Sequence, residues 1–288
     1  MTDRLPAAHR TCAQITRTQA RNFYYGIRLL SPPKRSALCA VYALARRIDD
    51  IGDGSGGADD KAAQLAALRG DLGRLTTATD PVLIAVGDAV ARFPIPVSAF
   101  GELIDGVEMD VMGTTYATFD DLVPYCRRVA GAVGRLCLGV YGTAPGTEET
   151  ASRHADALGI ALQQVNILRD IREDLLVGRV YLPKEDLDRF GITLGLNPDG
   201  SLADPGGGLR ALIGVAAARA AAWFDDGLRL LPMLDSRSAA CTAAMAGIYR
   251  DLLRIIEADP QVVFGGRISL SGWEKARVAG RALAGRAV

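Results

Sequence analysis

Apolar residues recur with the helical period over most of this chain, and this periodicity is the feature that most restricts its fold. Residues three and four apart share one face of a helix, whereas a strand needs alternating apolar and polar residues. Val, Ile and Thr seldom alternate here, and Gly or Pro marks most of the breaks. The pattern predicts helices over residues 9–29, 34–52, 59–77, 81–92, 96–112, 119–141, 148–176, 207–231, 236–258 and 271–284.

No linker or change of composition divides this pattern into two cores. The 288 residues are 49% hydrophobic and 23% charged, which is enough apolar material for one large core. We therefore predict that residues 1–288 form a single all-α domain. One connection, residues 191–208, is long, polar and rich in Gly and Pro, which is typical of a mobile surface loop or, less often, of an active-site lid.

The charge balance and the cysteines narrow the class of protein. Basic and acidic residues number 33 each, which disfavours a nucleic-acid binder that depends on a basic field. Five cysteines show no metal-binding or disulfide spacing, which favours a reduced, cytoplasmic compartment. The sequence contains no signal-peptide core and no apolar run of membrane-spanning length. Peripheral contact with the inner face of the membrane stays open.

The first of two acidic stripes lies in LCAVYALARRIDDIGD, residues 38–53. Residues one helical turn apart point the same way, so Asp49 and Asp53 share a face, which Arg46 and Tyr42 extend. Asp50 points about 100° aside. The neighbouring residues are aliphatic.

The second stripe lies in LGIALQQVNILRDIREDLL, residues 158–176. Gln163, Asn166, Asp170 and Asp174 follow one another at offsets of three, four and four, and therefore line one face of an otherwise apolar helix. The same geometry points Arg169 away from this face.

Paired carboxylates beside an apolar wall predict a site for a metal and a diphosphate with an apolar tail. Carboxylate oxygens suit Mg²⁺, which usually completes its coordination shell with water and substrate phosphates. One Asp-x-x-x-Asp pair is most often a solvated helix face, and Gln or Asn in an apolar helix is often a satisfied core residue. Since two stripes occur in register, we weigh the metal–diphosphate interpretation equally with this structural one.

Other candidates are weaker by themselves. Arg179 and Tyr181 in GRVYLP fit a helix-exit turn as well as a site, and residues 21–25 fit core packing. Tyr125 and Tyr249 are as readily explained as buried structural tyrosines. No glycine-rich motif follows a strand, so the chain shows no Rossmann nucleotide site.

Taken together, these segments resemble the squalene/phytoene synthases, which are head-to-head prenyl transferases of the class I isoprenoid synthase fold. The resemblance covers about residues 10–284. It is carried by NFYYGIRLLSPPKR, AVYALARRIDDIGD, YCRRVAGAVG and, most specifically, LQQVNILRDIREDLLVGRVYLP. Within the family the segments look most like bacterial presqualene diphosphate synthases of hopanoid pathways, an impression to which SAACTAAMAGIYRDLL and GRISLSGWEKA add.

The resemblance implies an all-α bundle with a central active-site cavity. It implies several Mg²⁺ ions held by Asp49, Asp53, Asn166, Asp170 and Asp174. It implies contacts to the diphosphate or prenyl substrate from Gln19, Ala20, Arg21, Asn22, Tyr42, Arg46, Gln163, Arg169, Arg179 and Tyr249. Many relatives have serines where this chain has Ala20 and Asn22. The four motif aspartates and Tyr125, which matches a tyrosine implicated in the chemistry, would be catalytic.

The implied activity is the condensation of two farnesyl diphosphates to presqualene diphosphate. One substrate would lose its diphosphate, the other would attack the allylic cation, and proton loss would close a cyclopropane. NADPH is not expected for this reaction. The alternatives are phytoene synthase, which uses geranylgeranyl diphosphate, and squalene synthase, which uses NADPH. A non-catalytic helical protein that binds prenyl lipids is a further alternative, against which the four aspartates argue.

Overall fold

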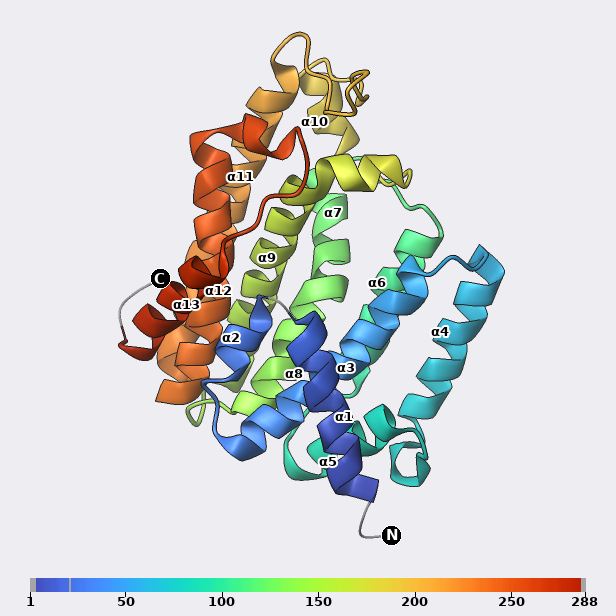
Figure 1. Ribbon diagram of the computed structural model, residues 1–288, viewed down its shortest axis with the longest axis vertical. Coiled ribbons are helices and arrows are strands. Elements are labelled where there is room, and N and C mark those ends of the chain that lie inside the picture. The colour runs from blue at the N-terminus through green and yellow to red at the C-terminus, as the bar shows by residue number, and fades with distance from the viewer. Residues whose placement is uncertain (1–3, 21, 286–288) are drawn as a thin grey trace.

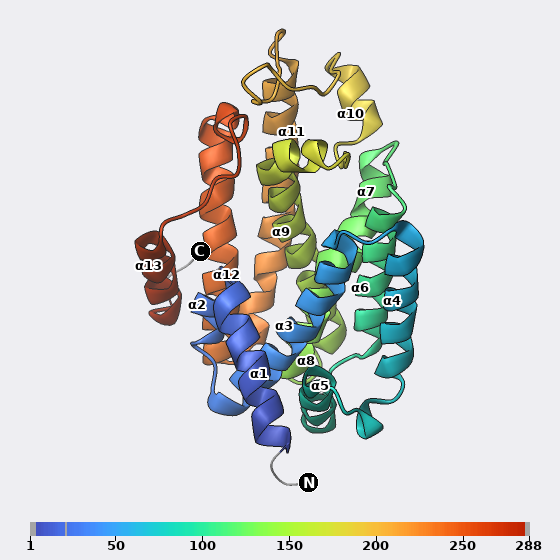
Figure 2. The same ribbon diagram turned by 45° about the vertical axis from the view of Figure 1, so that its right-hand side comes forward.

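Two long helices, α3 and α9, lie inside a bundle formed by the other helices (Figures 1 and 2). The computed structural model describes residues 4–20 and 22–285. In these ranges the secondary structure is helical, with no β-strand, so the all-α prediction is confirmed. The helices are α1 (Arg4–Gln19), α2 (Phe23–Ile27), α3 (Pro32–Asp53), α4 (Ala58–Leu72), α5 (Pro81–Arg92), α6 (Ser98–Val111), α7 (Phe119–Cys126), α8 (Ala132–Tyr141), α9 (Glu148–Leu176), α10 (Lys184–Arg189), α11 (Gly208–Gly227), α12 (Ser236–Ala258) and α13 (Gly272–Leu283).

The helix predicted over residues 9–29 is wrong in one respect, because the structure divides it into α1 and α2. Helix α1 packs against α3 and α5, whereas α2 packs against α12, so the chain must turn between them. Gly26 makes the second contact close, since a Cβ atom there would lie 2.7 Å from the carbonyl oxygen of Cys241. The short helix α10 was also missed, because six residues are too few to show a period.

The predicted helix over residues 119–141 contains an irregular turn. A π-helical turn, Arg127–Gly131, joins α7 to α8. It packs tightly against α9, where a Cβ atom on Gly159 would lie 2.5 Å from the carbonyl oxygen of Ala130. π-Helical turns occur frequently at functional sites.

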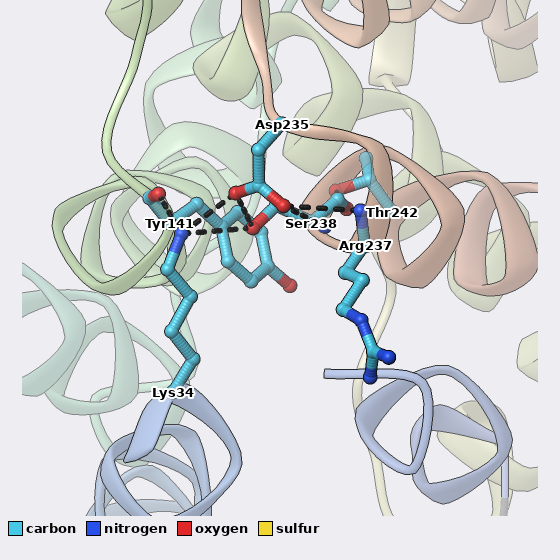
Figure 3. A network of polar contacts seen from close by, with 6 residues as sticks. All are labelled: Lys34, Tyr141, Asp235, Arg237, Ser238 and Thr242. Carbon is cyan, nitrogen blue, oxygen red and sulfur yellow. Dashed lines mark hydrogen bonds and ion pairs between the residues drawn. The ribbon is translucent and has the colours of Figure 1, made fainter. Parts of the chain in front are cut away.

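A polar cluster at the N-terminal end of α3 joins this helix to α8 and α12 (Figure 3). Lys34 donates to the Tyr141 carbonyl, to Asp235 Oδ2 at 2.7 Å and to Ser238 Oγ at 3.3 Å. Asp235 also caps α12 by accepting the N–H groups of Arg237 and Ser238. Burial alone would raise the pKa of Asp235, but the hydrogen bonds from Lys34 and Ser238 lower it to about 2. The cluster therefore fixes the starts of α3 and α12 against the end of α8.

The long connection at 191–208 has structure of its own. Leu196 and Leu202 form an isolated antiparallel bridge, and Asn197 donates to Ser201 Oγ at 3.0 Å. Leu202 is fully buried, so the loop is anchored to the core rather than free in solvent. The lid interpretation stays a prediction. Within the described ranges, none of the helices has the length and apolar character needed to cross a bilayer.

Candidate active site

A cavity of about 910 Å³ lies between α3, α8, α9 and α12. Part of its wall is aliphatic, with Leu38, Val41, Val133, Leu158 and Leu162 among its residues. The acidic stripes of α3 and α9 form the polar part. Both helices run upward in Figure 1, so their aspartate-bearing ends lie in the same half of the molecule. The cavity thus joins a charged end to an apolar interior.

The structure brings the sequence-predicted site residues together at this one cavity. Its lining includes Gln19, Ala20, Asn22, Tyr42, Arg46, Asp49, Asp53, Tyr125, Gln163, Asn166, Arg169, Asp170, Asp174, Arg179 and Tyr249. Arg21 lies outside the described residues. The role of each of these residues stays a prediction.

On α3, one residue of the stripe pairs with an acid outside the stripe, four residues further along the helix. Arg46 turns its guanidinium group to the acid beside the stripe, with Nη2 2.5 Å from Asp50 Oδ1. Burial, together with the neighbouring charges of Asp53 and Asp50, outweighs the effect of Arg46 and raises the pKa of Asp49 to about 7. Asp49 can therefore change its charge near neutral pH.

The stripe on α9 is bound into a network of arginines. Arg169 was predicted to point away, but its long side chain returns to the stripe and binds Asp170 through two contacts, Nε to Oδ1 at 2.7 Å and Nη2 to Oδ2 at 2.6 Å. Arg267, which follows α12 in the chain, donates from Nη2 to Asp170 Oδ2 at 2.7 Å. Both oxygens of this carboxylate are thus held by cationic donors.

Arg179 links the two stripes across the cavity. It lies just after α9 and donates from Nη1 to Asp53 Oδ1 on α3 at 3.0 Å. Burial and the charge of Asp170, opposed by Arg179, raise the pKa of Asp174 to about 7. The charged end therefore contains two aspartates paired with arginines and two that take up protons more readily than usual.

Two residues at this end, Asp110 and Arg267, were not predicted, and a third, Tyr181, was not assigned to the site. Asp110 on α6 accepts hydrogen bonds from Tyr125 Oη at 3.0 Å and from Tyr181 Oη at 2.7 Å. Tyr181 had been noted only in its helix-exit segment. Asp110, Tyr181 and Arg267 line the cavity. Asp110 is one of four acids in α6, so nothing in the sequence set it apart, whereas Arg267 lies in GRISLSGWEKA, a segment noted only for its resemblance to the family.

The donor set fits a divalent metal that also binds substrate. Asn166 Nδ2 donates to Gln163 Oε1 at 3.2 Å, while the buried Asn166 Oδ1 has no hydrogen-bond partner in the part of the chain that the structure describes. Asn166 precedes Asp170 by one turn, so this oxygen and the carboxylates suit Mg²⁺. In the same part, no three His, Cys, Asp or Glu side chains form a metal-binding group by themselves. Ligands from a diphosphate would complete the shell, as is usual for Mg²⁺.

Comparison with known sequences gives the relatives of the chain. The profile of the squalene/phytoene synthase family matches residues 16–274. Phytoene synthase of Mycobacterium tuberculosis is 55% identical over 277 residues, which are 96% of this chain and 91% of that protein. The 15-cis-phytoene synthase of Synechococcus elongatus is 35% identical over 282 residues, with 94% and 91% of the two chains covered.

Solved structures agree with this relationship. A dehydrosqualene synthase matches with a TM-score of 0.83 at 27% identity, covering 97% of this chain and 96% of that one. Squalene synthase HpnC from Alicyclobacillus acidocaldarius matches with a TM-score of 0.78 at 33% identity, covering 88% and 94%. The predicted isoprenoid synthase bundle is confirmed. The chain therefore belongs to the squalene/phytoene synthase family of head-to-head prenyl transferases.

Proposed function

We propose that this protein is a phytoene synthase that joins two molecules of geranylgeranyl diphosphate. The observation that carries the proposal is the 55% identity to phytoene synthase of Mycobacterium tuberculosis over 96% of the chain. The motifs of the chain look most like those of presqualene diphosphate synthases, whereas this similarity supports the phytoene alternative better. Two C20 chains become one C40 hydrocarbon when two diphosphates and two protons leave, so the balance needs no hydride donor.

The cavity offers what each part of such a substrate needs. Guanidinium groups of Arg46, Arg169, Arg179 and Arg267 lie at the charged end, where they can bind diphosphate oxygens in pairs. A divalent metal held by the stripe carboxylates would stabilise the departing diphosphate. The aliphatic wall surrounds the prenyl chain and keeps water away from an allylic cation.

A second candidate product is presqualene diphosphate from farnesyl diphosphate. It is supported by the 33% identity to a squalene synthase over 88% of this chain, and by the structural similarity to a dehydrosqualene synthase. Both candidates use the same charged site, but they differ in the length of the prenyl chain and in whether one or both diphosphates leave. The lower identity makes this the second choice.

The test is product analysis of the purified protein. Mg²⁺ is added with geranylgeranyl or farnesyl diphosphate, with and without NADPH, and the products are identified by mass spectrometry. A C40 hydrocarbon made from geranylgeranyl diphosphate without NADPH supports the proposal. A cyclopropyl C30 diphosphate made only from farnesyl diphosphate, or squalene that needs NADPH, would replace it with a sister activity.

Matched variants test whether the stripes are catalytic. Asp49→Asn and Asp170→Asn should each lower turnover by at least about 100-fold, since each removes a charge from the proposed metal site. Asp60→Asn on the exposed side of α4 is the control and should leave turnover unchanged. Circular dichroism checks that all variants keep their helices. Full activity of both stripe variants would mean that the stripe carboxylates are not catalytic, whereas a wild type that forms no product from either substrate would favour a prenyl-lipid-binding protein.

A further inference from the structure

A carboxylate and three tyrosines form a cluster at the cavity wall. Asp110 lies near the end of α6, and its two oxygens accept the hydroxyl hydrogens of Tyr125 and Tyr181. The rings of Tyr125 and Tyr181 stack with centroids 5.2 Å apart, and Tyr116 lies 5.5 Å and 6.4 Å from them. Asp110, Tyr125 and Tyr181 all line the cavity, so the cluster can reach a bound substrate.

The direction of the two hydrogen bonds determines what the tyrosines can do. A phenol carries one proton, and here each is donated to Asp110. The two hydroxyl groups also contact each other. A phenol oxygen has two lone pairs, so each can still accept a hydrogen bond from an outside donor. Burial raises the pKa of Tyr125 well above its ordinary value, and it also raises the pKa of Tyr181. Neither tyrosine can therefore serve as a base by becoming a tyrosinate. A proton accepted by either oxygen must be passed on at the same time.

Asp110 is suited to take that proton. Burial raises its pKa, although the hydrogen bonds from the two tyrosines oppose this effect. Two charged groups act on it: Arg179, in the segment after α9, lowers its pKa, and Asp53 on α3 raises it. The negative charge of Asp110 in turn contributes to the raised pKa values of Asp49 and Asp174.

We propose that Asp110 is a positioning residue that receives, through the hydroxyl of Tyr125 or Tyr181, the proton released when the cyclopropane closes. The inference rests on the proposed head-to-head condensation. In this step a C–H bond of the cation breaks and its electron pair forms the new C–C bond. The proton bonds to the phenol oxygen while the phenol's own proton moves to the carboxylate. The tyrosine stays neutral throughout, and Asp110 ends in its neutral acid form.

The test compares Asp110→Asn with the wild type in steady-state assays on geranylgeranyl and farnesyl diphosphate. Asparagine keeps the size of the side chain but cannot accept the proton. We expect kcat to fall by about 100-fold or more, the usual contribution of a positioned base, while KM changes by less than about threefold. Asp110→Glu should recover part of kcat. The control is Asp105→Asn, the same change on the outer side of α6, where Asp105 pairs with Arg69.

A second variant keeps the inference testable if Asp110→Asn unfolds. Tyr125→Phe/Tyr181→Phe leaves the carboxylate in place but removes both relays, and it should lose kcat to a similar extent with KM preserved. A kcat within about twofold of wild type in either folded variant would mean that another base, such as the released diphosphate, takes the proton. A rise in KM alone would also overturn the inference. A wild type that makes no product from either substrate would instead overturn the proposed function.

Discussion

Protons should compete with Mg²⁺ for the site, because two of its carboxyl groups titrate near neutral pH. The pKa of Asp49 and that of Asp174 are each raised to about 7, chiefly by burial. A metal binds the ionised form of a carboxyl group, so binding must release any proton that is present. We therefore expect the affinity for Mg²⁺ to fall steeply as the pH is lowered from 8 to 6.

The size of the effect follows from the two pKa values. A carboxyl group of pKa about 7 is about nine-tenths ionised at pH 8 and about one-tenth ionised at pH 6. An ion that needs one of these groups loses about tenfold in affinity over this range, and a metal cluster that needs both loses about 100-fold. The second case corresponds to about 2.7 kcal/mol of binding free energy. Ordinary aspartates, ionised at both pH values, would give no loss.

Isothermal titration calorimetry with MgCl₂ measures both the affinity and the proton release. Titrations at pH 6 and pH 8, repeated in buffers that differ in ionisation enthalpy, give the number of protons released per binding event. We expect nearly two protons at pH 6 and few at pH 8, and Asp49→Asn or Asp174→Asn should each remove about one. Equal affinities at the two pH values without proton release would refute the argument that burial controls these carboxyl groups.

Three further predictions concern stability. Because the raised pKa values mean that the folded state binds more protons than the unfolded state, the metal-free protein should lose stability as the pH rises from about 4 to about 7, and its melting temperature should be higher at pH 5.5 than at pH 8. Gly159→Ala should cost about 1–3 kcal/mol in urea unfolding, whereas Gly214→Ala, with open space around it in α11, should not destabilise. Arg135→Met should cost about 1–3 kcal/mol, since the half-buried Glu102 loses both of its hydrogen bonds from Arg135 and the buried Asp156 is left with Arg127.

Helix bounds could be predicted from the sequence where neighbouring residues determine them. Residues 81–92 and 236–258 were predicted with the bounds that α5 and α12 have. Asp80 and Asp235 cap these helices from the preceding position, so the signals for their starts lie within a few residues. The break between α1 and α2 has another origin, since it follows from the packing of α2 on α12, more than 200 residues away in the chain.

The same distinction applies to the candidate site. The two stripes could be found because one helix holds all the members of each stripe. Their partners could not, since Arg267 is 97 residues from Asp170 and Tyr181 is 71 residues from Asp110. The direction of Arg169 also escaped prediction, because helix geometry fixes where a side chain begins and not where a long side chain ends. The ion pair with Asp170 determines where the guanidinium group of Arg169 lies.

The four stripe carboxylates illustrate how a partly buried site can hold several negative charges. Arg179 pairs with Asp53, and Arg169 and Arg267 pair with Asp170. The pKa values of Asp49 and Asp174 are raised, so these two groups hold protons more readily than ordinary aspartates. A divalent metal would displace both the arginines and the protons, because it binds carboxylates that are ionised and not paired with another cation. The arginines freed in this exchange would then lie beside the metal with their donors available. Since a diphosphate needs such donors, binding of the metal and binding of the diphosphate should each favour the other.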